Sequence, residues 1–328
     1  MKTKPDGVSA GFNENLTENQ KAVNFKYAFF EGKFNNLENA KVSIMTNALQ
    51  YGTAVFGGIR GYYNSDENSL SVFRIRDHYA RFLSSIKMLG CNFPYSLDNL
   101  VEIHLDLINR NKPKCNSYFR PFAYVGNTSL GPNLHNVTLD YALYMIPLEE
   151  YMPLDKGLSL MVSSWRRSGD NSIPSRGKFS GAYLNSAFAR KEANDNGFDE
   201  AILLSEQGHV CEGSAENLFI IRDNVLITPA PCDDILEGIT RKTLLQIATD
   251  NGIKVIERSI DRSELYIADE VFLSGTGCQL AWVRAIDRRL ISDEIGPISK
   301  LLREEYFATV KGKINKYDDW CTKINIKD

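Results

Sequence analysis

The sequence predicts two α+β domains with a ligand-binding cleft between them. The chain has 328 residues, about the length of two average domains. Its apolar and charged fractions, 43% and 24%, are typical of globular proteins. Helical and strand patterns both occur, and a break containing Pro and Gly interrupts them at 147–157. We expect a smaller N-terminal domain at 1–147, an interdomain loop at 148–156 and a larger domain at 157–328.

The composition excludes several classes of protein. A net charge of −3 and a pI of about 5.9 leave no basic footprint of the kind that nucleic-acid-binding proteins need. No apolar run is long enough to cross a bilayer, and Met1 to Asn24 is polar with no apolar signal core. The cysteines form no C-x-x-C pair, and the histidines are scattered. We therefore expect a cytoplasmic protein with reduced thiols, no metal site, no nucleic-acid partner and no membrane association.

In the first half of the chain, strand patterns alternate with two amphipathic helices. Phe82 and Ile86 recur at helical spacing within 76–89, and Gly90 then stops that helix. Ser96 is a favourable cap for the second helix. In chain order, the expected elements are strands at 24–30, 58–63 and 70–74, helices at 76–89 and 97–108, and strands at 117–125 and 137–146.

After the break, short apolar runs typical of strands alternate with longer helical patterns. The expected strands are 158–164, 201–205, 217–221, 254–259 and 270–274. The expected helices are 182–194, 239–251 and 298–310. A cleft between two such domains is the usual place for a ligand site.

A loop containing Pro and Gly, at 173–181, leads into the helix expected at 182–194. Lys178 lies in this loop among small and apolar residues, and Tyr183 follows in the helix. A lysine amine forms Schiff bases with carbonyl compounds when burial lowers its pKa. The alternative is a solvated surface lysine, the commonest state of this residue type.

The same loop also matches a second type of chemistry. Ser175 and Lys178 have the S-x-x-K spacing, in which the lysine could activate the serine for acyl transfer. That mechanism needs S-D-N and K-T-G partners. Neither motif is present in the chain, so this signal is weak.

Two segments of small residues are candidate anion sites. Gly238 precedes the helix expected at 239–251, with Thr240 in the first turn, and helix N-termini bind phosphate well. The Ser-Gly-Thr-Gly segment at 274–277 could form an anion nest. The alternatives are an ordinary capped helix and a tight turn. The chain contains neither the G-x-G-x-x-G fingerprint nor a P-loop.

Two pairs of charged residues stand in small-residue or apolar surroundings. Glu212 and Glu216 precede an apolar strand, and a carboxylate inside a domain needs a cationic partner such as a protonated ring nitrogen. Arg60 and Arg120 lie among aromatic residues, and a buried arginine usually binds a carboxylate or phosphate. The alternatives are exposed acids in a hairpin turn and an internal salt bridge.

Taken together and in their order along the chain, the segments described above resemble the class IV pyridoxal-phosphate aminotransferases, and most closely the branched-chain amino-acid aminotransferases. The resemblance extends from about Phe25 to Trp320. Besides the Lys178 loop, the matching motifs are Y-G-x-x-x-F-x-G-I-R at 51–60, S-Y-F-R-P at 117–121, E-G-S-A-E-N-L-F at 212–219, L-x-G-I-T-R at 236–241 and A-D-E-V-F-x-S-G-T at 268–276.

The resemblance implies a two-domain, fold-type IV enzyme similar to D-amino-acid aminotransferase. It implies a small N-terminal α/β domain and a larger domain with a β-barrel-like core. The implied cofactor is pyridoxal 5'-phosphate. The implied reaction is ping-pong transamination of L-leucine, L-isoleucine and L-valine with 2-oxoglutarate, giving branched-chain 2-oxo acids and L-glutamate. A homodimer or higher homo-oligomer is also implied, in which the smaller domain of one chain closes the neighbour's pocket.

The resemblance also implies roles for individual residues. Lys178 is the catalytic residue, which forms the Schiff base and moves the Cα proton. Glu212 faces the pyridine nitrogen, and Tyr183 bonds the ring phenolate oxygen. The other cofactor-binding residues, around the phosphate, are Arg81, Gly238, Ile239, Thr240 and Thr276. The substrate-binding residues are Tyr51, Phe56, Arg60, Tyr118, Arg120, Tyr151, Thr276 and Gly277.

Three departures from the family pattern bear on substrate preference. Gly57 replaces an acid near Arg60, and Leu148 stands where many bacterial members carry Trp. Cys278-Gln279 replaces a pair made of a small residue and Glu. One alternative is therefore a D-amino-acid or amine transaminase or an aminodeoxychorismate lyase on the same fold. The S-x-x-K acyl-transferase and a non-catalytic binding protein are more remote.

Overall fold

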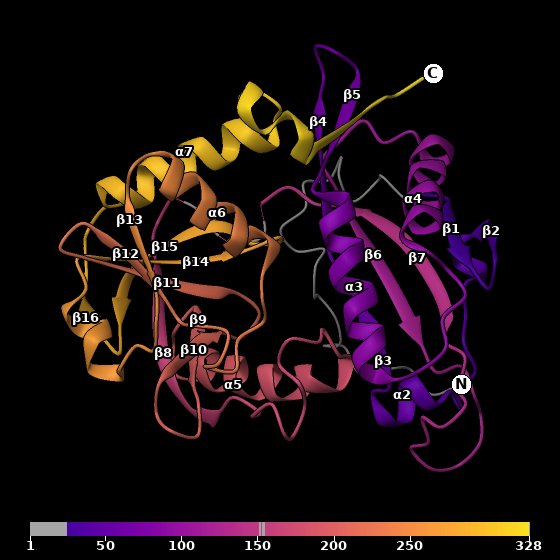
Figure 1. Ribbon diagram of the computed structural model, residues 1–328, viewed down its shortest axis with the longest axis horizontal. Coiled ribbons are helices and arrows are strands. Elements are labelled where there is room, and N and C mark those ends of the chain that lie inside the picture. Colours follow the sequence, from indigo (N-terminus) through magenta and orange to yellow (C-terminus); the bar gives the residue numbers. More distant parts are fainter. Residues whose placement is uncertain (1–24, 151, 153–154, 328) are drawn as a thin grey trace, which may run out of the picture.

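The chain forms two β-sheets, one built mainly from each half of the sequence (Figure 1). The computed structural model describes residues 25–150, 152 and 155–327. The polar segment Met1–Asn24, on which the cytoplasmic prediction partly depends, lies outside the described residues. The smaller and larger domains expected from the sequence correspond broadly to these two sheets, while the boundaries at 147 and 157 stay a prediction.

The first sheet has the strand order β17-β5-β4-β6-β7-β1-β2, with β3 paired to β6. The strands expected at 58–63 and 70–74 pair as the β4–β5 hairpin, and the strand expected at 24–30 pairs with β2, which was not expected. The strands are β1 (Tyr27–Phe30), β2 (Lys33–Asn36), β3 (Ala54–Phe56), β4 (Ile59–Asn64), β5 (Ser69–Phe73), β6 (Ser117–Tyr124), β7 (Asp140–Pro147) and β17 (Cys321–Asn325).

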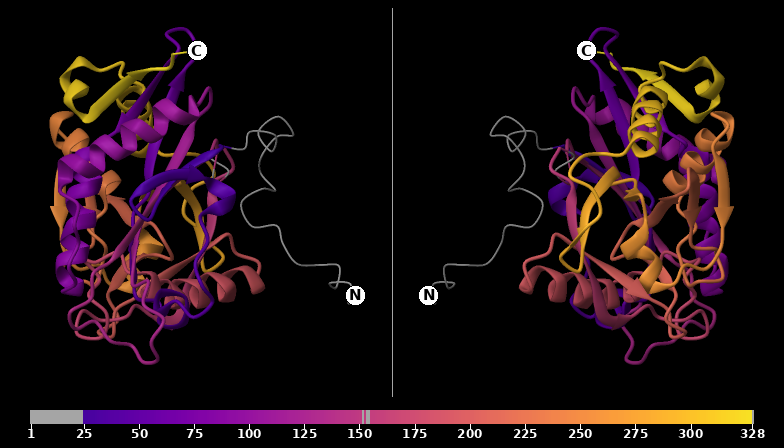
Figure 2. Two further views of the ribbon diagram at one scale, coloured as in Figure 1. Left: turned by 90° about the vertical axis from the view of Figure 1, so that its right-hand side faces the viewer. Right: turned by 90° about the vertical axis from the view of Figure 1, so that its left-hand side faces the viewer.

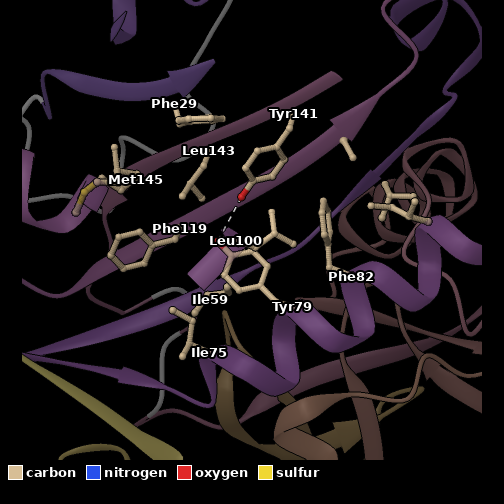
Figure 3. Close-up of a cluster of buried hydrophobic side chains, with 14 of the residues drawn as sticks. Phe29, Ile59, Ile75, Tyr79, Phe82, Leu100, Phe119, Tyr141, Leu143 and Met145 are labelled. Atoms are coloured by element: carbon tan, nitrogen blue, oxygen red, sulfur yellow. Dashed lines mark hydrogen bonds between the residues drawn. The ribbon is translucent and has the colours of Figure 1, made fainter. Parts of the chain in front are cut away.

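Helices α3 (Ile75–Leu89) and α4 (Leu97–Asn111) contribute to the core of the first sheet, and α2 (Asn47–Tyr51) is a short separate helix. Gly90 ends α3 at a φ of 73°, a left-handed conformation that glycine adopts without strain. Ser96 and Asn99 form a capping box at the start of α4. Aromatic and aliphatic side chains fill the core, where the Tyr79 and Tyr141 hydroxyls lie 3.3 Å apart (Figure 3).

The second sheet has the order β10-β9-β8-β15-β14-β11-β12-β13, with β16 paired to β15. An additional pairing between β10 and β11 closes six of these strands into a barrel, which confirms the expected barrel-like core. The strands are β8 (Leu158–Arg166), β9 (Glu200–Leu204), β10 (Val210–Gly213), β11 (Asn217–Arg222), β12 (Val225–Thr228), β13 (Lys254–Glu257), β14 (Glu270–Gly275), β15 (Gln279–Ile286) and β16 (Arg289–Leu290).

Three helices pack on this barrel. Helix α5 (Tyr183–Asp195) contacts β8 and β9. Helices α6 (Ile239–Asp250) and α7 (Pro297–Val310) contact each other and β14, and they lie together at the upper left of Figure 1. The N-termini of α5 and α6 both reach the cavity described below, so helix placement determines the site.

Every helix and strand expected from the sequence is present within a few residues, but several elements were missed. The missed strands β10 and β12 have four residues each, too few for a clear alternation pattern. Strand β15 was missed because it is a nearly continuous run of buried residues directly after a glycine-containing turn. The missed strand β17 runs beside β5 in the first sheet, so the C-terminus returns to the N-terminal half (Figure 2).

Candidate active site

A cavity of about 320 Å³ is lined by residues from both halves of the chain. Most of the site residues predicted from the sequence come together here, although they are far apart in the chain. The predicted residues that line the cavity are Phe56, Arg81, Tyr118, Arg120, Lys178, Tyr183, Glu212, Gly238, Ile239, Thr240, Thr276 and Gly277.

Lys178 is fixed by backbone contacts to the first sheet and to α3. Its carbonyl accepts a hydrogen bond from the Phe56 N–H at 3.0 Å, and its own N–H donates to the Ser85 Oγ at 3.1 Å. Its amine donates to the Tyr183 hydroxyl. The nitrogen lies 5.0 Å from the ring centroid of Phe56 and 4.9 Å from that of Tyr183. The amine therefore has a defined position inside the cavity.

Burial is the main reason why the pKa of Lys178 lies well below its ordinary value. The guanidinium groups of Arg81 and Arg120 lower this pKa further, while Glu212 acts in the opposite direction. An amine that stays uncharged keeps a free lone pair and can attack a carbonyl carbon. The alternative of a surface lysine is therefore wrong for Lys178.

Glu212 is a buried carboxylate on β10 with three partners. Its Oε1 pairs with Arg167 at 2.8 Å. Its Oε2 accepts hydrogen bonds from the Asn217 side chain at 3.1 Å and from the Leu236 N–H at 3.0 Å. Burial raises the pKa of Glu212, and the ion pair with Arg167 opposes that shift. The alternative of exposed acids in a hairpin turn is wrong, because Glu216 is buried as well.

The sequence analysis did not identify Arg167 as a site residue. It follows the last residue of β8, and its side chain is buried against Glu212. The one feature of the local sequence that could have indicated Arg167 as a site residue is its position just after an apolar strand. A buried arginine there needs a carboxylate, but nothing nearby in the sequence indicates which one.

Other residues that line the cavity were given no role by the sequence analysis, although Glu216 and the segment at 274–277 were noted there as candidates. They come from α5, from the turn between β10 and β11, and from the loops around Leu236 and Cys278. Burial and the neighbouring Glu200 raise the pKa of Glu216, one of these residues, to about 8. The set is Ser186, Ala187, Arg190, Ser214, Ala215, Glu216, Asn217, Leu236, Ser274, Gly275 and Cys278, together with Gly58 and Leu148.

One end of the cavity is suited to an anion. The N-terminus of α6 lines it, and the first backbone bond within this helix runs from the Lys242 N–H to the Gly238 carbonyl at 2.9 Å. The preceding N–H groups of the first turn therefore have no partner within the helix. Arg81 donates to the Glu237 carbonyl at 3.2 Å, directly before the helix begins. Thr276 lines the same cavity.

Another wall combines aromatic rings with a cation. Tyr118 and Arg120 are two residues apart on β6 and therefore point to the same face. Arg120 donates to the Tyr118 hydroxyl at 3.0 Å. Its guanidinium carbon lies 4.7 Å from the Phe56 ring centroid and 5.2 Å from that of Tyr118. This wall can contact both apolar and carboxylate groups.

Arg60 is buried but does not line the cavity. It donates to the carbonyls of Gly277 and Leu148 at 3.0 Å each, and also to that of Glu149. Arg60 thus connects the start of the predicted interdomain loop with the loop that carries Gly277. The alternative of an internal salt bridge does not apply, because its described partners are carbonyl groups.

Besides Arg60, two further predicted substrate-binding residues are not placed in the cavity. Tyr51 does not line it in the single chain. Its side chain is 37% exposed, and its hydroxyl accepts a hydrogen bond from the Gly131 N–H at 3.1 Å. Tyr151 lies outside the described residues.

The S-x-x-K alternative finds no support in the geometry. Ser175 does not line the cavity, and its buried Oγ has no hydrogen-bond partner within the described part of the chain. The amine of Lys178 contacts Tyr183 instead.

Taken together, these groups suit Schiff-base chemistry on an anionic ligand. A lysine amine with a lowered pKa can bond an aldehyde, a paired carboxylate can face a protonated ring nitrogen, and a helix N-terminus can hold a phosphate. Pyridoxal phosphate carries all three of these groups. Within residues 25–150, 152 and 155–327, no set of three or more His, Cys, Asp or Glu could hold a metal ion, and no helix has the length and apolarity needed to cross a membrane. The fold and the cavity define a protein suited to Schiff-base chemistry at Lys178.

Comparison with known proteins identifies the family. The profile of the family described as amino-transferase class IV matches residues 55–286. The probable branched-chain-amino-acid aminotransferase of Aquifex aeolicus is 47% identical over 306 residues, which are 93% of this chain and 98% of that protein. The chain belongs to the class IV aminotransferase family.

Solved structures agree with this family and its fold-type IV architecture. The holo-form, with pyridoxal phosphate, of the branched-chain amino acid aminotransferase from Thermobaculum terrenum matches with a TM-score of 0.87 and 34% identity, covering 92% of this chain and 99% of that one. The branched-chain aminotransferase from the thermophilic archaeon Thermoproteus uzoniensis, solved with norvaline, matches with a TM-score of 0.87 and 40% identity, covering 90% of this chain and 98% of that one.

Proposed function

We propose that the protein is a pyridoxal-phosphate-dependent transaminase of L-leucine, L-isoleucine and L-valine, with 2-oxoglutarate as the amino-group acceptor. The products are the branched-chain 2-oxo acids and L-glutamate. The observation that carries the proposal is the Lys178 amine, whose pKa is lowered by burial and which lies in the same cavity as Glu212, the partner of Arg167. The relatives named as branched-chain aminotransferases support the substrate class.

The proposed catalytic residue is Lys178. When bound, pyridoxal phosphate supplies an aldehyde for Schiff-base formation and a ring that accepts the electron pair from the substrate Cα. Lys178 would hold the cofactor through its amine, and the same amine would move the proton at the substrate Cα. Glu212 would pair with the protonated ring nitrogen, and the ion pair with Arg167 favours the carboxylate form of Glu212. Tyr183 orients the Lys178 amine and donates to the ring phenolate oxygen.

The phosphate is proposed to lie at the N-terminus of α6. Gly238, Ile239 and Thr240 present unpaired N–H groups and one hydroxyl there. Arg81 supplies a positive charge, and Thr276 supplies a second hydroxyl. A dianion is therefore neutralised by a cation and by the helix dipole together.

The substrate is proposed to lie against the aromatic wall. Tyr118 and the backbone N–H groups at Thr276–Gly277 bind its carboxylate, and Phe56 contacts an aliphatic side chain. Arg120 binds the side-chain carboxylate of glutamate, which allows one site to serve both substrates. Arg60 orders the rim through the carbonyl of Gly277.

We further propose a homodimer or higher homo-oligomer. Several large apolar side chains at or before α2 are exposed, namely Val42, Ile44, Met45 and Leu49. A patch of this kind is typical of an interaction surface. Tyr51 lies on the same helix, and we propose that it reaches the pocket of a second copy that covers this patch. Tyr151 is proposed for the same pocket. We also propose a cytoplasmic location, and domain boundaries at 147 and 157.

An absorbance spectrum of the purified protein, recorded before and after L-leucine is added, tests the function. We expect a visible band from bound cofactor, its loss with L-leucine and its return with 2-oxoglutarate. A band that responds to D-alanine but not to L-leucine would move the substrate to the D-amino-acid branch. Absence of a band after incubation with pyridoxal phosphate would contradict the role of Lys178.

A further inference from the structure

One face of α3 is directed at the second half of the chain. Arg81 and Ser85 are four residues apart on this helix and therefore lie on the same face. Arg81 donates to the Glu237 carbonyl at 3.2 Å, directly before α6. The Ser85 hydroxyl accepts from the Lys178 N–H at 3.1 Å. Arg74 caps the start of the helix, about two turns before Arg81, and also reaches the second half.

Arg74 is connected to α6 by two consecutive hydrogen bonds. A guanidinium group only donates, so the Thr243 hydroxyl accepts from the Nη1 of Arg74, at 2.9 Å. The proton of that hydroxyl is donated to the Ile239 carbonyl at 2.8 Å. Arg74 and Thr243 are both buried. Because Ile239 is the first residue of α6 and lines the cavity, the two bonds join the start of α3 to the cavity end of α6.

Arg74 is itself held in place by several contacts. Its Nε pairs with Asp77 at 2.6 Å, and its guanidinium carbon lies 4.7 Å from the ring centroid of Trp320. Its backbone N–H donates to the Trp320 carbonyl at 2.6 Å. Its φ is 47°, a left-handed conformation that is uncommon for a residue other than glycine and persists only where the surroundings impose it. Arg74 therefore presents a donor to Thr243 at a fixed position.

The proposed phosphate site is built from two elements that belong to different halves of the chain. Arg81 supplies the cation from α3, while the unpaired N–H groups come from the first turn of α6. Both elements line the cavity, whereas Arg74 and Thr243 do not. An anion is bound tightly only when all of its donors are already in position. Contacts that fix α3 against α6 therefore bear directly on this site.

We propose that Arg74 and Thr243 are positioning residues, whose buried bond holds the N-terminus of α6 against α3 so that Arg81 and the α6 N–H groups meet on one phosphate. This inference rests on the proposed function, which places the phosphate of pyridoxal phosphate at the start of α6. Neither side chain contacts the phosphate; both act through the helices that carry the donors.

The substitution Thr243→Val separates this positioning from the charge of Arg74. Valine has nearly the size of threonine but no hydroxyl, so the bond from Arg74 is lost while the charge stays in place. If Arg74 acted only as a cation near the anion, Thr243→Val would have no effect on the phosphate site. Thr243→Ser keeps the hydroxyl and is the conservative variant that should restore the wild-type behaviour.

The readout is the ratio of the dissociation constants of the full-length apoenzyme for pyridoxal and for pyridoxal phosphate, measured by absorbance titration. Only the second ligand carries a phosphate, so the ratio reports on the phosphate site, and general damage to the cavity would weaken both ligands alike. We expect Thr243→Val to lower the ratio about fivefold, a part of the effect of one hydrogen bond to a charged group. Thr243→Ser should stay within about twofold of wild type.

Thr249→Val is the matched control on the same helix. The Thr249 hydroxyl donates to the Leu245 carbonyl at 2.9 Å, the same type of bond that Thr243 makes to Ile239. Thr249 is exposed, near the C-terminal end of α6 and far along the helix from the cavity. Its replacement should leave the ratio unchanged, which would show that loss of a helical hydroxyl alone does not affect the phosphate.

The double variant Arg74→Met/Thr243→Val tests whether the two side chains act through one bond. Arg74→Met removes both the bond and the charge, so it should lower the ratio at least as much as Thr243→Val. The double variant should then match Arg74→Met, because no second bond is left to lose. Effects that add up in the double variant would mean that the two residues act independently, and would overturn the proposal.

The remaining outcomes distinguish this inference from the proposed function. A wild-type ratio in Thr243→Val overturns the positioning role, even if Arg74→Met lowers the ratio through its charge. If Thr243→Val does not fold, Thr243→Ala removes the same hydroxyl without a branched side chain. The same fall in the ratio is then expected, and an unchanged ratio would again overturn the role. A wild-type apoenzyme that binds pyridoxal as tightly as pyridoxal phosphate would instead contradict the phosphate site itself.

Discussion

At the scale of single residues, the cavity holds charged groups that burial alone would disfavour. Burial lowers the pKa of Lys178 and so favours the neutral amine, the form needed for attack on a carbonyl. Glu212 remains a carboxylate because Arg167 lies 2.8 Å away. The same cavity therefore holds an amine with a lowered pKa and a buried ion pair.

Replacing Lys178 with Ala should abolish transamination while the fold survives. Loss of the Lys178 amine, which is proposed to bind the cofactor and to move the proton, should lower the turnover number by about 10²- to 10⁴-fold or more. Lys191→Ala, at an exposed lysine paired with Asp195 on α5, is the matched control and should retain activity. Activity near that of wild type in Lys178→Ala would rule out the mechanism.

The buried amine should also destabilise the apoenzyme at neutral pH. The pKa of Lys178 in the folded state lies below its ordinary value of 10.5, so the unfolded chain binds the proton more tightly. Stability should therefore rise as the pH increases toward 10.5. Apo Lys178→Met should be more stable than the apo wild type at pH 7, by about 1.4 kcal/mol for each unit by which the pKa is lowered.

Urea unfolding of both apoproteins between pH 7 and pH 10.5 measures this difference. The advantage of Lys178→Met should shrink as the pH rises, because the unfolded wild type then loses its extra proton. A constant difference across this range would mean that the amine is not held uncharged.

At the scale of secondary-structure elements, helix ends are encoded locally and place functional groups. Ser96 and Asn99 form the box that starts α4, and Gly90 ends α3, the helix that carries Arg81. Helix α6 begins directly after Gly238, whose backbone is extended, and the first residues of the helix line the cavity. Each of these signals was recognisable in the sequence because it involves near neighbours.

Ser96→Ala should lower the free energy of unfolding by about 1 kcal/mol, the usual effect of removing a helix cap. Chemical denaturation of the apoprotein measures the loss. Ser84→Ala is the control, since its hydroxyl bonds only to the Ala80 carbonyl within α3. A loss at Ser84 equal to that at Ser96 would mean that the capping box contributes nothing.

At the scale of the whole molecule, the exposed apolar side chains before and in α2 remain without a partner in the single chain. Ile44 is 83% exposed, and Leu49 on α2 is also largely exposed. Covering such side chains gains roughly 25 cal/mol per Å² of apolar surface. We therefore expect the assembled form to bury this patch.

Ile44→Asp should weaken the proposed dimer and shift it toward monomer at micromolar concentrations, because a buried charge without a partner is unfavourable. Light scattering after size exclusion measures the mass. Leu290→Asp, at an exposed leucine on β16, should leave the mass unchanged. A wild-type protein that is monomeric at these concentrations would contradict the dimer.

The sequence by itself determined the family, the helix and most strand positions, and the candidates Lys178 and Glu212. These features depend on periodicity, caps and short motifs, in which the interacting residues are neighbours in the chain. Only the tertiary structure decided that Arg167 neutralises Glu212, that β10 and β11 close the barrel, that β17 joins the first sheet and that Arg60 connects two loops. Those contacts join residues that are distant in the chain. They form only once packing brings the elements together, and no local pattern encodes them.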